Sequence, residues 1–132
     1  MNINAMPSPG KVFPKIVLVV DDDDAIVNVI KAHLESEDFA VLRSGTAEEA
    51  LETVRNAKVM AVLLDLGLPD LDGFEVLKKI KEVKPLVPVI IVTGCHEEAD
   101  ARRAFELGAW DYVTKPIDFK YLKNVLCLER SE

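Results

Sequence analysis

Five polar side chains stand at or just after the ends of short apolar runs, far apart along the chain: Asp21, Asp22, Asp65, Thr93 and Lys115. Carboxylates gathered at one place repel, since two charges about 4 Å apart interact by roughly 4 kcal/mol at an effective dielectric constant of about 20. Three such groups would take up protons or bind a cation, and Mg²⁺, which prefers oxygen ligands, is the cation we expect. A hydroxyl and an amine nearby are groups that bind phosphoryl oxygens, so the set predicts phosphoryl-transfer chemistry.

An alternation of apolar runs and helical patterns indicates which elements carry these side chains. The expected strands are Ile16–Val20, Phe39–Leu42, Val59–Leu64, Pro88–Val92 and Trp110–Val113. The expected helices are Ala25–Leu34, residues 46–56, Gly73–Val83, Glu97–Leu107 and Phe119–Leu128. This order predicts an α/β fold, a doubly wound, five-stranded parallel sheet with helices on both faces. Such sheets bind ligands beyond the carboxyl ends of their strands, so we expect the polar side chains to meet at one rim.

The ends of the first two strands carry different expectations. Asp23 and Asp24 are expected to begin the first helix, where negative charge suits the helix dipole, and to have no ligand role. The second strand ends in Arg43-Ser44-Gly45, which offers no distinctive group.

The first helix should bury a stripe of apolar residues at helical spacing: Ile26, Val29, Ile30 and Leu34.

The composition limits the class of protein. Lys and Arg number 16 against 23 Asp and Glu, a net charge of −7, which argues against a nucleic-acid partner because that requires a basic face. No apolar run approaches the roughly 20 residues of a membrane helix, and the start lacks the apolar core of a signal peptide. The two cysteines have no metal-site or redox-motif spacing, which is typical of reduced thiols in the cytoplasm. Residues 1–14, rich in Pro and Gly, are expected to be a flexible leader before one domain at 15–131.

Four segments together resemble the receiver domain of bacterial two-component response regulators, of the chemotaxis-regulator type: KIVLVVDDDDAI, VLLDLGLPDLDG, VIIVTG and GAWDYVTKPID. The resemblance covers residue 15 to about residue 130. It implies a flavodoxin-like sheet with strand order 2-1-3-4-5, and a phosphorylation-activated switch, not an enzyme. The implied phosphoryl donor is a sensor histidine kinase or a phosphotransfer protein, and the implied target is an effector domain or protein.

The resemblance also implies roles for individual residues at the rim. Asp65 is the expected phosphoacceptor. Asp22, Asp65 and the backbone carbonyl of Gly67 are the expected direct ligands of Mg²⁺, with Asp21 acting mainly through bound water. Lys115 is expected to pair with Asp65 and, after phosphorylation, with a phosphoryl oxygen.

The same resemblance implies a conformational switch. Thr93 would turn its hydroxyl onto the phosphoryl group, and Tyr112 would turn inward into the vacated space. The surface formed by residues 97–128 would then change, and the family also uses this surface for homodimers. The Lys115–Pro116 peptide bond is expected to be cis, as in the family.

Two positions depart from residues that tune hydrolysis in the family. Gly67 and Cys95 lie two places after Asp65 and Thr93, and neither orients water well, so we expect a long-lived phosphorylated state. A degenerate receiver that acts as a phosphorylation-independent interaction module is the alternative, and the complete set of rim residues speaks against it. A phosphatase of the aspartyl-nucleophile type would need an acid in place of Gly67.

Overall fold

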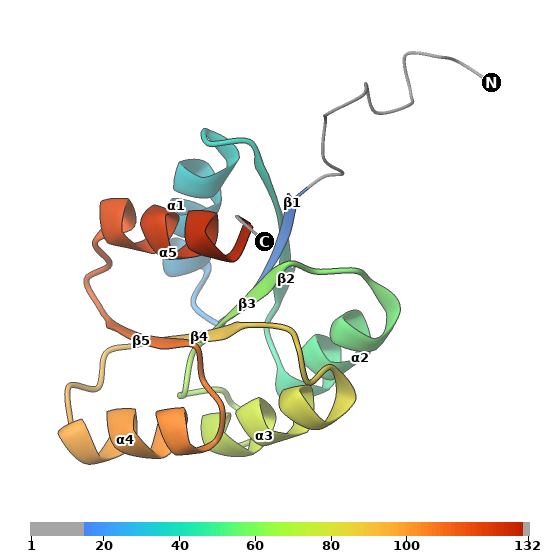
Figure 1. The fold of residues 1–132 in the computed structure, drawn as a ribbon, viewed down its shortest axis with the longest axis vertical. Helices are drawn as coiled ribbons and strands as arrows, with labels where there is room; N and C mark the ends of the chain where they lie inside the picture. Colours follow the sequence, from blue (N-terminus) through green and yellow to red (C-terminus); the bar gives the residue numbers. More distant parts are fainter. Residues whose placement is uncertain (1–14, 131–132) are drawn as a thin grey trace.

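A computed structural model of the chain describes residues 15–130, within which five parallel strands form one sheet (Figure 1). The strands are β1 (Lys15–Val20), β2 (Phe39–Ser44), β3 (Ala61–Leu64), β4 (Val89–Thr93) and β5 (Asp111–Thr114). The helices are α1 (Asp24–Glu35), α2 (Ala47–Asn56), α3 (Gly73–Val83), α4 (Glu98–Glu106) and α5 (Phe119–Arg130). The sheet order β2-β1-β3-β4-β5 confirms the predicted doubly wound, flavodoxin-like fold. The leader expected at 1–14 lies outside the described residues.

The helices cover both faces of the sheet. α1 and α5 pack on one face, and α2, α3 and α4 pack on the other (Figure 1). Successive side chains of β1 alternate between the two cores, with Val17 and Val19 in the α1–α5 core and Leu18 and Val20 in the other. This follows from the period of two along a strand, and it explains why successive residues of β1 from Ile16 to Val20 are all apolar. Among the described residues, no helix combines the length and the apolar character required to cross a membrane.

The buried stripe of α1 differs from the expected one. Its buried residues are Val27, Ile30 and Leu34, whereas Val29 is 47% exposed. The expectation for Val29 was therefore wrong. Residues 27 and 29 are both valine, so the pattern of apolar residues alone could not show which valine packs against the sheet.

Helices α1, α2 and α3 each begin at a side-chain cap, which satisfies backbone N–H groups that have no partner inside the helix. The caps are Asp23, as expected, Thr46 and Asp72. Asp70 adds a cap from another segment, since its carboxylate accepts from the N–H groups of Ala47 and Glu48 at 2.8 and 3.2 Å. These bonds, chiefly the one from Ala47, hold the pKa of Asp70 below its ordinary value. They also fasten the β3–α3 loop to the start of α2.

Gly73 allows α3 to begin directly against the β3–α3 loop. A Cβ added at Gly73 would lie 2.4 Å from the Cα of Leu66, a distance that no real side chain tolerates. The N–H of Gly73 donates to the carbonyl of Leu66 at 3.2 Å. The glycine therefore fixes the position of the residue that follows Asp65.

Candidate functional site

The carboxyl ends of β1 and β3 bring three carboxylates together, those of Asp21, Asp22 and Asp65, which we call the carboxylate cluster. The pairing of Val20 with Leu64 sets the two strand ends side by side. One oxygen from each of the three side chains lies within 4.8 Å of the others. Asp21 is buried, Asp65 is partly buried and Asp22 is exposed, so the cluster is open to solvent at Asp22.

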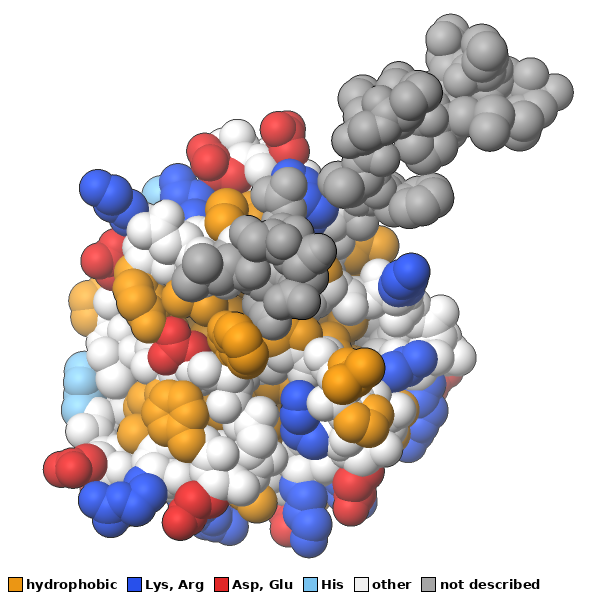
Figure 2. Space-filling model, viewed as in Figure 1, with side chains coloured by type: hydrophobic (Ala, Val, Ile, Leu, Met, Phe, Trp, Pro, Cys, Tyr) orange, Lys and Arg blue, Asp and Glu red, His pale blue; other side chains and the backbone are white. Residues whose placement is uncertain are grey.

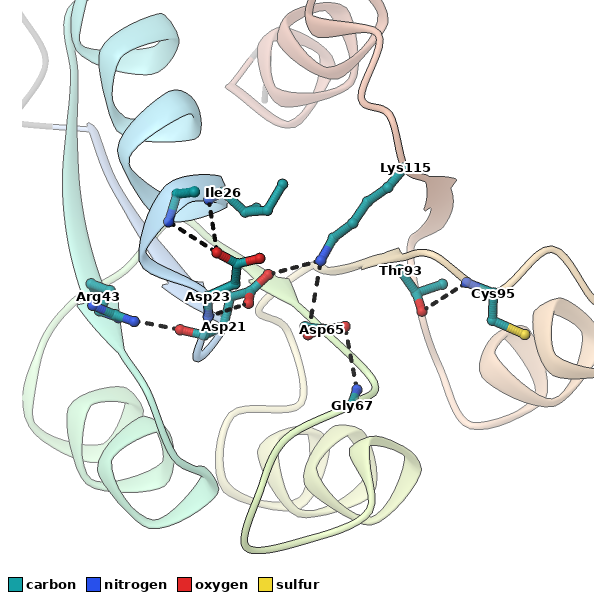
Figure 3. Close-up of polar contacts among 10 residues, drawn as sticks. Asp21, Asp23, Ile26, Arg43, Asp65, Gly67, Thr93, Cys95 and Lys115 are labelled. Atoms are coloured by element: carbon teal, nitrogen blue, oxygen red, sulfur yellow. Dashed lines mark hydrogen bonds and ion pairs between the residues drawn. The ribbon is translucent and has the colours of Figure 1, made fainter.

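Lys115 reaches two members of the carboxylate cluster, Asp21 and Asp65, from the loop after β5 (Figure 3). Its Nζ lies 3.1 Å from Asp21 Oδ2 and 3.9 Å from Asp65 Oδ2. The expected pairing with Asp65 is thus the longer of the two contacts. Asp21 takes the shorter one because its side chain is only 3% exposed, and a carboxylate removed from water requires a partner charge. The peptide bond from Lys115 to Pro116 is cis, as the resemblance implied.

The charges of the cluster are not balanced. Burial raises the pKa of the Asp65 carboxyl above its ordinary value, and the charge of Asp21 raises it further. The N–H of Gly67, which donates to Asp65 Oδ1 at 3.3 Å, and the charge of Lys115 lower this pKa, but the net effect is upward. An excess of negative charge on oxygen ligands at a partly buried place suits a hard divalent cation, so the cluster has the residues to hold one.

Thr93 and Tyr112 both contact the β4–α4 loop at Cys95. Thr93 ends β4, is 5% exposed, and accepts a hydrogen bond on Oγ1 from the N–H of Cys95 at 3.2 Å (Figure 3). The hydroxyl of Tyr112 donates to the carbonyl of Cys95 at 3.0 Å. Burial and the neighbouring Cys95 raise the pKa of Tyr112 to about 12, so its hydroxyl remains protonated and able to donate. The two residues expected to switch are therefore linked through one backbone position.

Gly67 leaves open space beside Asp65. A Cβ added at this position would lie 3.9 Å from Asp65 Oδ2, which is an ordinary contact distance. A larger side chain at residue 67 would therefore fit next to the carboxylate.

The end of β2 contributes a contact that the sequence interpretation missed. Arg43 Nε donates to the backbone carbonyl of Asp21 at 3.2 Å, and Arg43 Nη1 lies 2.7 Å from Asp24 Oδ1. The expectation that this strand end offers no distinctive group was wrong. Arg43 belongs to no motif, and the parallel pairing that sets it opposite Val19 is what places it beside the β1–α1 loop.

Comparison with known proteins identifies the family. Residues 17–126 match the model of the response regulator receiver domain, which covers more than half of the chain. The chain belongs to this family. This receiver domain is 40% identical over 102 residues to the alkaline phosphatase synthesis transcriptional regulatory protein PhoP of Bacillus subtilis (strain 168), over 77% of the chain and 42% of that protein. The chain therefore spans less than half the length of this curated relative.

Solved structures of receiver domains have the same fold. A CheY-like receiver domain protein from Methanospirillum hungatei JF-1 is 32% identical with a TM-score of 0.83, over 90% of this chain and 98% of that one. The receiver domain of the sensor histidine kinase PA1611 from Pseudomonas aeruginosa PAO1 is 25% identical with a TM-score of 0.82, over 91% of this chain and 100% of that one. That structure has a magnesium ion coordinated in its active-site cleft. The resemblance seen in the sequence is confirmed.

Proposed function

We propose that this receiver domain is a phosphorylation-activated switch that accepts a phosphoryl group on Asp65 from a sensor histidine kinase or a phosphotransfer protein. The observation that carries the proposal is the carboxylate cluster with Lys115 at the rim of the sheet. Asp21 is buried and accepts from Lys115 and from the N–H of Asp23 at 2.9 Å. Asp65 is more accessible than Asp21, with side-chain exposures of 13% and 3%, and burial raises the pKa of the Asp65 carboxyl above its ordinary value.

The transfer needs little covalent chemistry from the protein. An oxygen of Asp65 attacks phosphorus, a P–O bond forms, and the P–N bond of the phosphohistidine breaks. The departing imidazole nitrogen keeps the electron pair and takes up a proton. Lys115 is near enough to Asp65 to contact a phosphoryl oxygen, and Thr93 can turn its hydroxyl to another, so both stabilise the charge that develops there.

We assign the divalent cation to the same cluster. Asp22, Asp65 and the carbonyl of Gly67 would hold Mg²⁺ directly, and Asp21, already engaged by Lys115, would act through water. When bound, Mg²⁺ supplies charge neutralisation at the phosphoryl oxygens. The fit rests on oxygen ligands within 4.8 Å of one another and on the carboxylates of Asp21 and Asp22, whose charges add to burial in raising the pKa of Asp65.

The output of the switch is proposed to run through Thr93 and Tyr112 to the surface formed by residues 97–128. A turn of the Thr93 hydroxyl onto the phosphoryl group releases the N–H of Cys95, the residue that also binds Tyr112. Phosphorylation favours that arrangement only by its differential affinity for the two states. Three large side chains on this surface are partly exposed and could contact an effector or a second copy: Phe105 at 48%, Trp110 at 52% and Tyr121 at 46%.

The setting of the domain is also a proposal. We propose that the protein acts in a phosphorelay in the cytoplasm and that its receiver domain spans residues 15–131. In this role it accepts a phosphoryl group and does not turn over a separate substrate. The net charge of −7 supports the absence of direct contact with nucleic acid by this segment, and on the face shown in Figure 2 the Lys and Arg side chains are interspersed with Asp and Glu.

Incubation with acetyl phosphate and Mg²⁺, followed by intact-mass measurement, tests the function. The wild type should gain one phosphoryl group, Asp65→Ala should gain none, and EDTA should prevent the reaction. Glu82→Ala, which removes an exposed carboxylate from α3, is the control and should react like the wild type. An unlabelled wild type would favour the degenerate, phosphorylation-independent module, and equal labelling of Asp65→Ala would exclude Asp65 as the acceptor.

A further inference from the structure

The β1–α1 loop, which carries Asp21 and Asp22, is fastened to the end of β2 by three contacts. The N–H of Asp21 donates to the carbonyl of Ser44 at 3.0 Å. The carbonyl of Asp21 accepts from Arg43 Nε at 3.2 Å (Figure 3). Arg43 Nη1 lies 2.7 Å from Asp24 Oδ1. One guanidinium thus holds the residues on either side of Asp22 and Asp23.

We propose that Arg43 is a positioning residue for the divalent cation. By holding Asp21 and Asp24, it sets the conformation of residues 21–24 and thereby the direction of the Asp22 carboxylate. The inference rests on the proposed function, because it concerns the same cation site. Arg43 acts through Asp21 and Asp24 and is not itself a ligand.

Arg43 has two effects on a bound cation, and they oppose one another. Its positive charge repels the cation, which alone would weaken binding. Its contacts order the loop in advance, so that Asp22 loses less conformational freedom on binding, which strengthens it. The side chain of Arg43 is 35% exposed and that of Asp24 is 80% exposed, so solvent screens both the repulsion of the cation and the ion pair with Asp24. The hydrogen bond to the carbonyl of Asp21 is partly buried and is weakened less, so the ordering of the loop is expected to be the larger effect.

The arrangement requires arginine in particular. Nε and Nη1 contact acceptors on two different residues at once, and the planar guanidinium holds these donors at a fixed spacing. Lysine carries the same charge on one nitrogen at the end of a flexible chain. Arg43→Lys therefore preserves the charge and removes the geometry, which separates the two effects.

The test is a titration of the unphosphorylated chain with MgCl₂, followed by amide NMR and by the rise in melting temperature. Arg43→Lys should raise the Mg²⁺ dissociation constant by about tenfold, as is typical when groups that orient metal ligands are lost. Arg43→Gln should raise it too, but by less, because the lost charge relieves part of the repulsion. Arg55→Gln, which removes a charge from the last turn of α2, is the control and should bind like the wild type. Melting in EDTA reports folding separately.

Each outcome decides the proposal. If Arg43→Lys binds Mg²⁺ as tightly as the wild type, Arg43 acts at most through its charge and the inference is overturned. Tighter binding by Arg43→Gln overturns it as well, since repulsion would then be the larger effect. A wild type that binds no Mg²⁺ would contradict the cation site of the proposed function itself, whereas normal wild-type binding with unaffected variants contradicts only the role of Arg43.

Discussion

Asp65→Asn examines the electrostatics of the carboxylate cluster without any phosphoryl donor. The substitution keeps the shape of the side chain and removes its charge. Without a divalent cation the charge of Asp65 is destabilising, because burial and Asp21 raise its pKa above the ordinary value of 3.8. We therefore expect Asp65→Asn to unfold at a higher temperature than the wild type in EDTA at neutral pH.

The expected size of this stabilisation follows from the distances between Asp65 and its charged neighbours. Asp21 and Asp22 each lie within 4.8 Å of Asp65, a repulsion of about 3.5 kcal/mol apiece at an effective dielectric constant near 20. Lys115, at 3.9 Å from Asp65, offsets about 4 kcal/mol of this. Burial of Asp65 adds to the remainder, whereas the N–H of Gly67 and solvent at the exposed Asp22 reduce it, which leaves about 1 to 2 kcal/mol of destabilisation. For a domain of this size that corresponds to roughly 4 to 8 °C in melting temperature.

The assay is thermal unfolding followed by circular dichroism, in EDTA and in MgCl₂. Because the folded-state pKa of Asp65 is raised, protonation of Asp65 stabilises the fold. The difference in melting temperature between the wild type and Asp65→Asn should therefore shrink as the pH falls through that raised pKa toward 3.8. Mg²⁺ should stabilise the wild type more than the variant. Glu82→Gln, exposed on α3, controls for net charge. A melting temperature of Asp65→Asn at or below that of the wild type in EDTA would refute this reasoning.

Three further substitutions probe the neighbours of Asp65. Gly67→Asn should shorten the lifetime of the phosphorylated state by about two- to tenfold, because one hydrogen bond that orients the attacking water changes the hydrolysis rate by about that factor. Phos-tag gels measure the decay. An unchanged lifetime counts against the role given to Gly67. Lys115→Met should lower the free energy of unfolding in EDTA by about 3 kcal/mol, because it leaves the buried Asp21 without its ion pair; a urea midpoint equal to that of the wild type would contradict this. Gly73→Ala should cost about 1 to 3 kcal/mol and slow labelling by acetyl phosphate, because its Cβ would lie 2.4 Å from the Cα of Leu66. Gly45→Ala, whose Cβ would meet its nearest neighbour at 3.8 Å, should change neither, and a similar loss in both variants would argue against a specific role for Gly73.

The parallel sheet and the meeting of distant carboxylates could be predicted from the sequence because both follow from periodicity and topology, whereas the strand order was implied by the family resemblance alone. Short apolar runs separated by helical patterns lead to a parallel sheet with two covered faces. The residues at the carboxyl ends of β1 and β3 then share one rim, whatever the details of the loops. Asp21, Asp22 and Asp65 therefore needed no side-chain geometry to be placed together.

The contacts that depend on register and loop conformation could not be predicted. Arg43 meets Asp21 only because β1 and β2 pair with Val19 opposite Arg43. Asp70 caps α2 from a loop more than twenty positions away, and no local sequence pattern predicts this hydrogen bond. The closer contact of Lys115 with Asp21 depends on how deeply each carboxylate is buried, which the sequence does not specify.

The central claim, that Asp65 itself accepts the phosphoryl group, can be measured by trapping the product. Sodium borohydride reduces an acyl phosphate to an alcohol, which converts a phosphorylated aspartate to homoserine, and tandem mass spectrometry then locates the modified residue. After reaction with acetyl phosphate and Mg²⁺, homoserine should be found at position 65, and it should be absent when EDTA is present. Homoserine at Asp21 or Asp22, or none at any position, would contradict the account.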